Sequence, residues 1–166
     1  MKSKKPIDYD EALSMCASLC ARGEQCTPEL KAKMQKRGLG YSDVEKVIRR
    51  LIELRFVDDD RFARTYAHHK MAYSGWGRNK IIQGLWAKRL QRSSIDQCMD
   101  EIDEDEYEAV AERVIRTKLR LSPTDMLATY EGKIKVLKYA MQRGFEARLA
   151  GGIINRIIRE LREDDT

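Results

Sequence analysis

Four cysteines and two histidines are the side chains of this sequence best suited to metal binding or nucleophilic chemistry. Cys16 and Cys20 are four residues apart and share a helix face, and Cys26 follows. Structural zinc sites need four well-spaced ligands, and no second pair completes such a set. The spacing instead predicts reduced thiols that pack as small apolar side chains. His68 and His69 are adjacent and diverge by about 100° on a helix, so we expect one to pack and the other to meet solvent.

Two short segments are the remaining candidates for ligand chemistry. Gly75-Trp76-Gly77 lacks the spacing of a phosphate loop. It predicts either a helix–helix turn or a helix start whose free N–H groups bind a phosphate oxygen, and we favour the turn. Asp58-Asp59-Asp60 is typical of an acidic helix N-terminus rather than a cation site. With no nucleophile-plus-base signature, the sequence predicts a protein that is not an enzyme and needs no metal or cofactor.

A basic stretch is the strongest charge feature. Residues 61–95 contain no acid, and their bases are Arg61, Arg64, Lys70, Arg78, Lys80, Lys88, Arg89 and Arg92. Charge of one sign attracts polyanions or an acidic protein surface. The alternative is a solvated helical face balanced by the acids of residues 100–112. Phe62, Tyr66 and Trp86 lie within the stretch at helical spacing, which favours a core position over base stacking.

The composition limits the class of protein. The chain has 166 residues, 42% of them apolar and 36% charged, with a net charge of +5. This fraction of apolar residues is enough to form the core of one domain or of a short array of repeats. Three prolines and few aromatic residues favour helices over an all-β fold. No apolar run suits a bilayer-spanning helix or a secretory signal, so we expect a cytoplasmic protein.

Apolar residues recur at three- and four-residue steps along most of the chain, as in Leu149, Ile153, Ile157 and Leu161. We predict caps at Thr27, Ser42 and Ser94, and helix ends before Gly38 and Gly144. The predicted helices are 8–22, 27–37, 42–55, 59–73, 77–89, 94–102, 104–120, 126–143 and 146–162.

The helices fall into three sets of three. The middle helices of the sets align Leu30 with Ile82 and Val136, and Arg37 with Arg89 and Arg143. The three matches recur at similar spacing, which indicates a repeat. We therefore predict an all-α tandem array of three three-helix repeats, 1–57, 58–103 and 104–166, elongated and curved because each unit contacts mainly its neighbours.

Three segments of the chain carry a resemblance to a known family. The first is Thr27-Pro28-Glu29-Leu30-Lys31-Ala32-Lys33-Met34, followed by Arg37-Gly38 and Val44-Glu45-Lys46-Val47-Ile48. The second is Leu54-Arg55-Phe56-Val57-Asp58-Asp59-Asp60-Arg61-Phe62-Ala63-Arg64, followed by Gly75-Trp76-Gly77-Arg78-Asn79-Lys80-Ile81. The third is Arg143-Gly144-Phe145. In this order they make the chain resemble the RecX regulatory-protein family over nearly its full length. Arg55 and Leu90 stand where that family usually has glycine, so helix termination is expected to differ there.

The resemblance implies tandem three-helix repeats that bind the RecA recombinase and its filament on single-stranded DNA. Such proteins curb ATP hydrolysis and strand exchange, and so modulate recombination, DNA repair and the SOS response; members also bind DNA to varying degrees. We predict that the eight bases above contact RecA acids or DNA phosphates, and that Lys133, Lys135 and Lys138 extend the same face. One alternative is a stand-alone helical module for single-stranded or duplex DNA, and another is an adaptor for some other protein.

Overall fold

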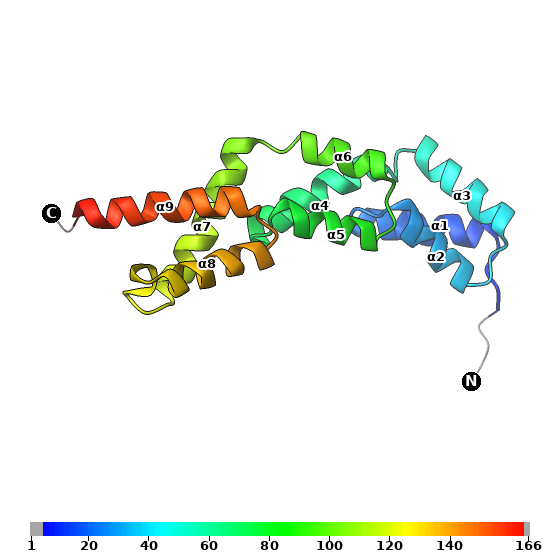
Figure 1. Cartoon of the computed structure of the whole chain (residues 1–166). Coiled ribbons are helices and arrows are strands. Elements are labelled where there is room, and N and C mark those ends of the chain that lie inside the picture. Colours follow the sequence, from blue (N-terminus) through cyan, green and yellow to red (C-terminus); the bar gives the residue numbers. More distant parts are fainter. Residues whose placement is uncertain (1–4, 165–166) are drawn as a thin grey trace. The chain divides into compact units, whose positions relative to one another are not determined.

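The computed structural model describes residues 5–164, which form helices joined by short turns (Figure 1). The α-helices are α1 (Tyr9–Arg22), α2 (Thr27–Lys36), α3 (Tyr41–Glu53), α4 (Asp59–Ser74), α5 (Arg78–Ala87), α6 (Arg92–Asp100), α7 (Glu104–Arg120), α8 (Tyr130–Gln142) and α9 (Ala147–Asp164), with a 3₁₀ turn η1 (Met126–Ala128) before α8. The predicted all-α fold is confirmed. The helices divide into two compact units, and α4, α5 and α6 each contribute to both. The predicted repeat boundaries do not coincide with these units and stay a prediction.

The first unit contains residues up to Thr65 together with Leu85–Cys98. Its best-packed part is the set α1, α2 and α3, in which α3 contacts both other helices (Figure 1). Leu30, Met34, Val44 and Leu51 fill the centre of this set and are fully buried. Their spacing follows the helical period, so burial of one apolar face accounts for the packing of α2 and α3.

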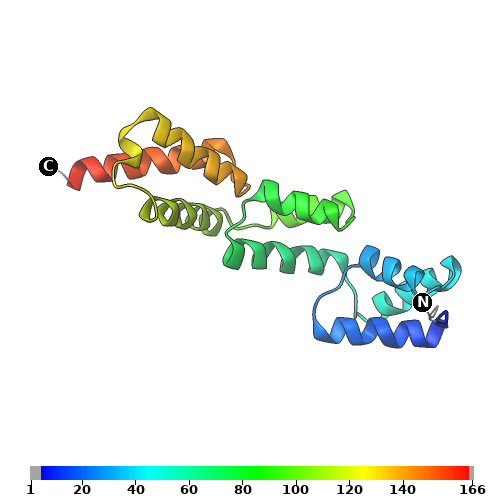
Figure 2. The same cartoon turned by 90° about the horizontal axis from the view of Figure 1, so that it is seen from below.

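The second unit contains Tyr66–Gly84 and the chain from Met99 onward. Helices α7, α8 and α9 lie side by side in it (Figure 2). Tyr107, Phe145 and Ile153 are among the largest buried side chains of this unit. A ladder of ion pairs joins α7 to α9 at the surface, in which Arg156 contacts Glu108 and Glu112 at 2.8 Å. The predicted helix 126–143 is instead η1 and α8, because the Thr129 hydroxyl caps α8 by accepting from the Gly132 N–H.

The helix caps partly follow the sequence. Gly38 and Gly144 have positive φ directly after α2 and α8, as predicted. The predicted caps at Ser42 and Ser94 are wrong, because α3 begins at Tyr41 and α6 at Arg92. Thr27 lies inside α2, and its backbone N–H and hydroxyl both donate to the Asp59 carboxylate, at 2.8 and 2.6 Å. A carboxylate from the start of α4 therefore stabilises the start of α2.

The ends of the three middle helices correct the repeat alignment by one residue. The positive-φ residues are Gly38, Arg89 and Gly144, rather than Gly38, Leu90 and Gly144. After each of them, the next N–H donates to a carbonyl five residues back, which defines the same helix-ending motif in all three repeats. The equivalent buried positions are therefore Leu30, Ile81 and Val136. Helix α5 ends one residue earlier than the sequence alignment assumed, so Ile82 is only half-buried.

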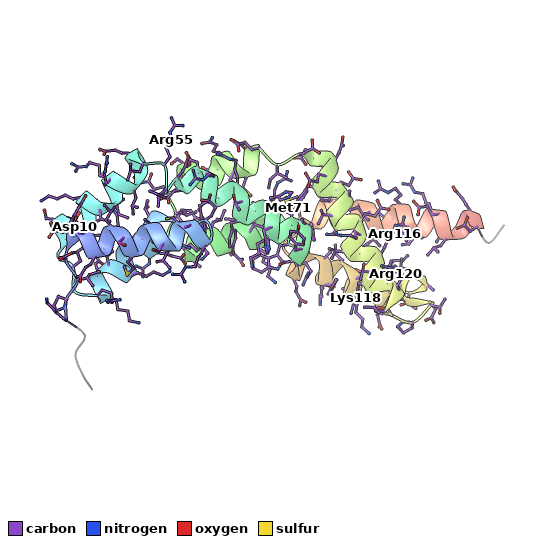
Figure 3. The ribbon with its side chains drawn as sticks, turned by 180° about the vertical axis from the view of Figure 1, so that it is seen from behind. Asp10, Arg55, Met71, Arg116, Lys118 and Arg120 are labelled. Carbon is purple, nitrogen blue, oxygen red and sulfur yellow. The ribbon has the colours of Figure 1, made fainter. Side chains whose placement is uncertain are left out.

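Arg55 ends α3 with the same geometry. Its φ is +59°, its N–H donates to the Ile52 carbonyl at 3.0 Å, and the Phe56 N–H donates to the Leu51 carbonyl at 2.9 Å. The side chain of Arg55 extends into solvent (Figure 3). A residue with a Cβ in this region is strained, so glycine fits the position better.

Candidate partner-binding surface

The basic stretch forms α4, α5 and the start of α6, and its residues fall in both compact units. The first unit holds Arg61, Arg64, Lys88, Arg89 and Arg92, whereas the second holds Lys70, Arg78, Lys80, Lys133, Lys135 and Lys138. The structure separates these bases into those that hold helices together and those whose charge is available to a partner.

Arg61 and Lys88 hold parts of the first unit together. The Arg61 Nε atom lies 2.7 Å from Glu24, and its guanidinium also donates to the carbonyls of Arg55 and Phe56 beyond α3. Lys88 binds Glu29 at 2.7 Å. The hydrogen bond from Lys88 lowers the pKa of Glu29, so this carboxylate is charged at neutral pH. Both bases therefore have internal roles.

Arg78 is largely enclosed, since only 18% of its side chain is accessible. Its guanidinium lies 4.0 Å above the Tyr107 ring and forms ion pairs with Glu104 and Glu146. The Tyr107 hydroxyl donates to Glu146 at 2.6 Å and accepts the Arg78 backbone N–H at 2.9 Å. Burial, followed by the bond to Glu146, raises the pKa of Tyr107, so its hydroxyl keeps its proton. This cluster joins the start of α5 to α7 and α9.

The more accessible bases lie at the ends of α5 and α6 and along α8. Arg89 is exposed just after α5, and 82% of the Arg92 side chain is accessible beside Asp96 on the next turn. Lys135 and Lys138 are exposed on α8, three residues apart, whereas Lys133 is half-buried. Arg64 is exposed on α4. Arg89, Arg92, Lys135 and Lys138 can reach a partner without breaking an internal network of the kind that holds Arg78.

Lys70 and Lys80 share one aromatic partner. The Lys70 ammonium lies 4.5 Å from the centroid of the Trp76 ring, and the Lys80 ammonium lies 4.7 Å from it. Lys70 also lies 5.5 Å from the Tyr66 ring. The sequence analysis named both lysines but not Trp76 as part of the surface. The sequence feature that could have indicated this role of Trp76 is its position between two lysines in a stretch without acids.

The turn that carries Trp76 has its backbone donors satisfied. The N–H groups of Gly77 and Asn79 donate to the carbonyls of Arg143 and Gly144, at 2.8 and 3.0 Å, and that of Arg78 donates to Tyr107. The alternative in which free N–H groups bind phosphate is therefore wrong, and the helix–helix turn is confirmed. Gly77 lies so close to Gly144 that a Cβ on it would be 2.3 Å from the Gly144 carbonyl carbon.

The aromatic residues differ in burial. Phe62 is 7% exposed, as a core position requires, whereas Tyr66 is only half-buried. Trp86 is 50% exposed, so the prediction that it packs in the core is wrong. Trp86 is adjacent to Leu85, which is fully buried. Adjacent side chains of a helix point in different directions, so Leu85 lies on the inner face of α5 and Trp86 does not.

Cys16, Cys26 and Cys98 are buried and Cys20 is half-buried, in agreement with their predicted packing role. Burial raises the pKa of Cys16 and Cys26 to about 11, which keeps both thiols protonated and unreactive at neutral pH. Within residues 5–164, the cysteines, histidines and acids form no group suited to a metal ion. His68 and His69 are both exposed, which corrects the expectation that one packs. Asp58 caps α4 by accepting the Arg61 N–H, so the acidic helix start is confirmed.

The sequence analysis missed a group of arginines on α7. Arg116 binds Glu112 and Glu160 at 2.7 and 2.6 Å, and Arg113 donates to the Ala72 carbonyl near the end of α4. Figure 3 shows Arg116, Lys118 and Arg120 along α7. A groove of about 820 Å³ lies beside them between α7, η1 and α9. These bases did not stand out in the sequence, because acids outnumber bases in residues 100–125 and the segment as a whole is negative.

The chain is a helical-repeat protein, a class that commonly offers extended binding surfaces. Residues 58–99 match the family described as RecX, second three-helix domain. A regulatory protein RecX of Mycobacterium sp. (strain JLS) is 26% identical over 152 residues, which cover 90% of this chain and 83% of that protein. A regulatory protein RecX of Lactobacillus johnsonii is 25% identical, covering 99% of this chain and 60% of that one.

Solved structures agree with these sequence matches. The crystal structure of RecX from Lactobacillus salivarius aligns with a TM-score of 0.77 at 17% identity, over 92% of this chain and 96% of that one. A second crystal structure, of a regulatory protein RecX, aligns with a TM-score of 0.71 at 16% identity, over 89% and 73% of the two chains. The resemblance found in the sequence is thus confirmed: the chain is similar to regulatory proteins RecX over 90% of its length and shares their fold. Among residues 5–164, none of the helices is long and apolar enough to cross a membrane.

Proposed function

We propose that this protein binds the RecA recombinase and its filament on DNA, and that it inhibits ATP hydrolysis and strand exchange by RecA. The observation that carries the proposal is similarity over 90% of the chain to proteins named for a regulatory role. The protein then modulates recombination and DNA repair as a cytoplasmic binding partner rather than as an enzyme. The exposed cations just after α5, on α6 and on α8 support a role in which charge attracts an acidic or phosphate-bearing filament surface.

We expect Arg89, Arg92, Lys135 and Lys138 to contribute most to filament binding, because their side chains are accessible. Arg61, Arg78 and Lys88 are expected to contribute indirectly, since each already binds a carboxylate of this chain. Several weak contacts along a filament raise the apparent affinity above that of any one patch. Whether a given base meets RecA or DNA is decided by the assays that follow.

The direct test is ATP hydrolysis by the cognate RecA on single-stranded DNA, with this protein added at two DNA concentrations. We expect inhibition well below one molecule per RecA and no relief by extra DNA. Charge reversal at Arg89, Arg92, Lys135 and Lys138 should abolish inhibition, whereas Lys33→Glu with Lys36→Glu on α2 should not. Full inhibition by the first variant would contradict the assignment of the surface, and failure of the unaltered protein to inhibit would contradict the function.

The second candidate is a stand-alone helical DNA-binding module. The Lys70–Trp76–Lys80 group favours it, because cations around an aromatic ring suit a nucleic-acid strand. In that case inhibition of RecA would disappear with extra DNA, since the protein would compete for the strand. Binding to DNA would also be strong without RecA and would weaken steeply with salt.

A further inference from the structure

The Trp76 ring organises two positive charges in the second unit. The ammonium groups of Lys70 and Lys80 lie 4.5 and 4.7 Å from the same ring centroid. A cation over an indole face is attracted by the electrons of the ring, and tryptophan is the best aromatic partner for this contact. Both ammonium groups therefore lie against the same indole, where they can contact phosphates of a bound strand.

The backbone fixes this arrangement at three points. The Trp76 N–H donates to the Lys70 carbonyl at 3.0 Å, which places the indole beside the last turns of α4. Lys80 is held against the α8–α9 turn, where a Cβ on Gly144 would be 2.5 Å from the Lys80 Cβ. The close backbone contact of Gly77 with Gly144 fixes the turn between the two lysines. The cluster is thus built on rigid elements and not on a free loop.

No ion pair neutralises the cluster among the residues that the structure describes: within residues 5–164, neither Lys70 nor Lys80 lies within ion-pair distance of a carboxylate. Glu104 and Glu146, near the starts of α7 and α9, bind Arg78 instead. Two unpaired ammonium groups on one ring favour an anionic ligand that also offers a flat apolar surface.

We infer that Lys70, Trp76 and Lys80 form a contact site for single-stranded nucleic acid. The phosphates draw the ammonium groups from the indole, because attraction between full charges exceeds attraction to a ring. The exposed ring face then stacks on an unpaired base. In a duplex the bases are already stacked on each other, so the indole has no partner there. This inference deepens the proposed function, and it rests on that function only for placing the strand in a recombinase filament.

Tryptophan fluorescence tests the site directly, because the chain has only Trp76 and Trp86. Trp86→Phe changes a residue that is 50% exposed and leaves Trp76 as the single reporter. We expect oligothymidylate to quench this fluorescence with saturation, without RecA present. An equal length of duplex DNA should quench it much less. Quenching by neither, or equal quenching by both, would overturn the assignment to a single strand.

The salt dependence of binding separates the lysines from general positive charge. Each phosphate contact on a single strand contributes about 0.7 to the slope of log affinity against log salt concentration. Lys70→Gln with Lys80→Gln should therefore reduce the slope by about 1.4. The matched control, Lys33→Gln with Lys36→Gln on α2, removes the same charge outside the proposed binding residues and should change the slope less. Equal effects of the two variants would overturn the site.

Trp76→Leu, made in the chain that retains Trp86, tests the stacking step by a gel-shift measurement. We expect about 5- to 150-fold weaker binding, the range that loss of one stacked base produces, with an unchanged salt slope because both lysines remain. Undiminished affinity would overturn the stacking role. The same variants in the RecA ATPase assay keep the two proposals distinct. If the unaltered protein binds the strand at Trp76 but fails to inhibit RecA, the site stands and the proposed function does not.

Discussion

The contact between Gly77 and Gly144 gives the sharpest stability prediction. A Cβ on Gly77 would lie 2.3 Å from the Gly144 carbonyl carbon and 2.4 Å from the Phe145 nitrogen, whereas ordinary contact begins at 3.4 Å. Gly77→Ala therefore forces the α4–α5 turn and the α8–α9 turn apart by about 1 Å, which overpacking studies associate with a cost of 1–3 kcal/mol. Backbone atoms block the methyl group on the Gly144 side, so no side-chain rotation relieves it.

The same displacement breaks hydrogen bonds. The N–H groups of Gly77 and Asn79 lose the carbonyls of Arg143 and Gly144, and each lost hydrogen bond costs about 1 kcal/mol net. We expect the free energy of unfolding to fall by about 3–5 kcal/mol, a large part of the 5–15 kcal/mol typical of a domain. In a chain of this length that corresponds to a melting temperature lower by roughly 6–20 °C.

Urea and thermal unfolding followed by far-ultraviolet circular dichroism measure this loss. The matched control is Gly151→Ala within α9, where a Cβ would meet nothing within 4 Å. Because alanine favours a helix over glycine, that variant should gain up to about 1 kcal/mol. A loss below about 1 kcal/mol for Gly77→Ala would refute the reasoning, since the two turns could then separate without cost.

Three further changes test other parts of the structure by denaturation. Arg55→Gly should raise the free energy of unfolding by about 0.5–1 kcal/mol, because it relieves a φ of +59° at an exposed side chain; an unchanged or lower value would contradict the strain. Tyr107→Phe should lower it by about 2 kcal/mol, because Glu146 and the Arg78 N–H lose the shared hydroxyl; retention of full stability would show that water replaces it. Lys88 lowers the pKa of Glu29, so this pair stabilises the fold above the unfolded-state pKa of about 4.3 and loses its effect as the pH falls through the lowered folded-state pKa. Urea unfolding at a series of pH values should therefore show that Glu29→Gln loses less of its free energy of unfolding at acid pH than the unaltered protein. Identical pH profiles would exclude a contribution of the Glu29–Lys88 pair to the acid sensitivity.

Helical period and glycine positions were sufficient to predict the helices of this chain, because those signals are local. Gly38 and Gly144 ended their helices as predicted, whereas Ser42 and Ser94 did not cap theirs. A serine cap competes with the tertiary packing of the turn before it, which the sequence does not display. The one-residue error in the repeat alignment arose because arginine occupies the positive-φ position at 89, where only glycine would have been recognised.

The candidate surface was harder to predict because charge alone does not distinguish a structural base from an available one. Arg78 and Arg92 look alike in the sequence, yet one is 18% exposed between two carboxylates and the other is 82% exposed. The partners of Arg78 come from residues 104 and 146, which no local pattern connects to it. Trp76 was overlooked for the same reason, since its relation to Lys70 and Lys80 depends on the turn between two helices.

The three donors at the start of α5 have a consequence for how the chain folds. Their acceptors are the Tyr107 hydroxyl and the carbonyls of Arg143 and Gly144, all of which follow the segment 58–99 that matches the second three-helix domain. On a ribosome this segment emerges while its N–H groups still face water. The hydrogen bonds that fix the start of α5 in its final position can therefore form only after α7 and the α8–α9 turn have been synthesised, so the segment acquires its full stability late.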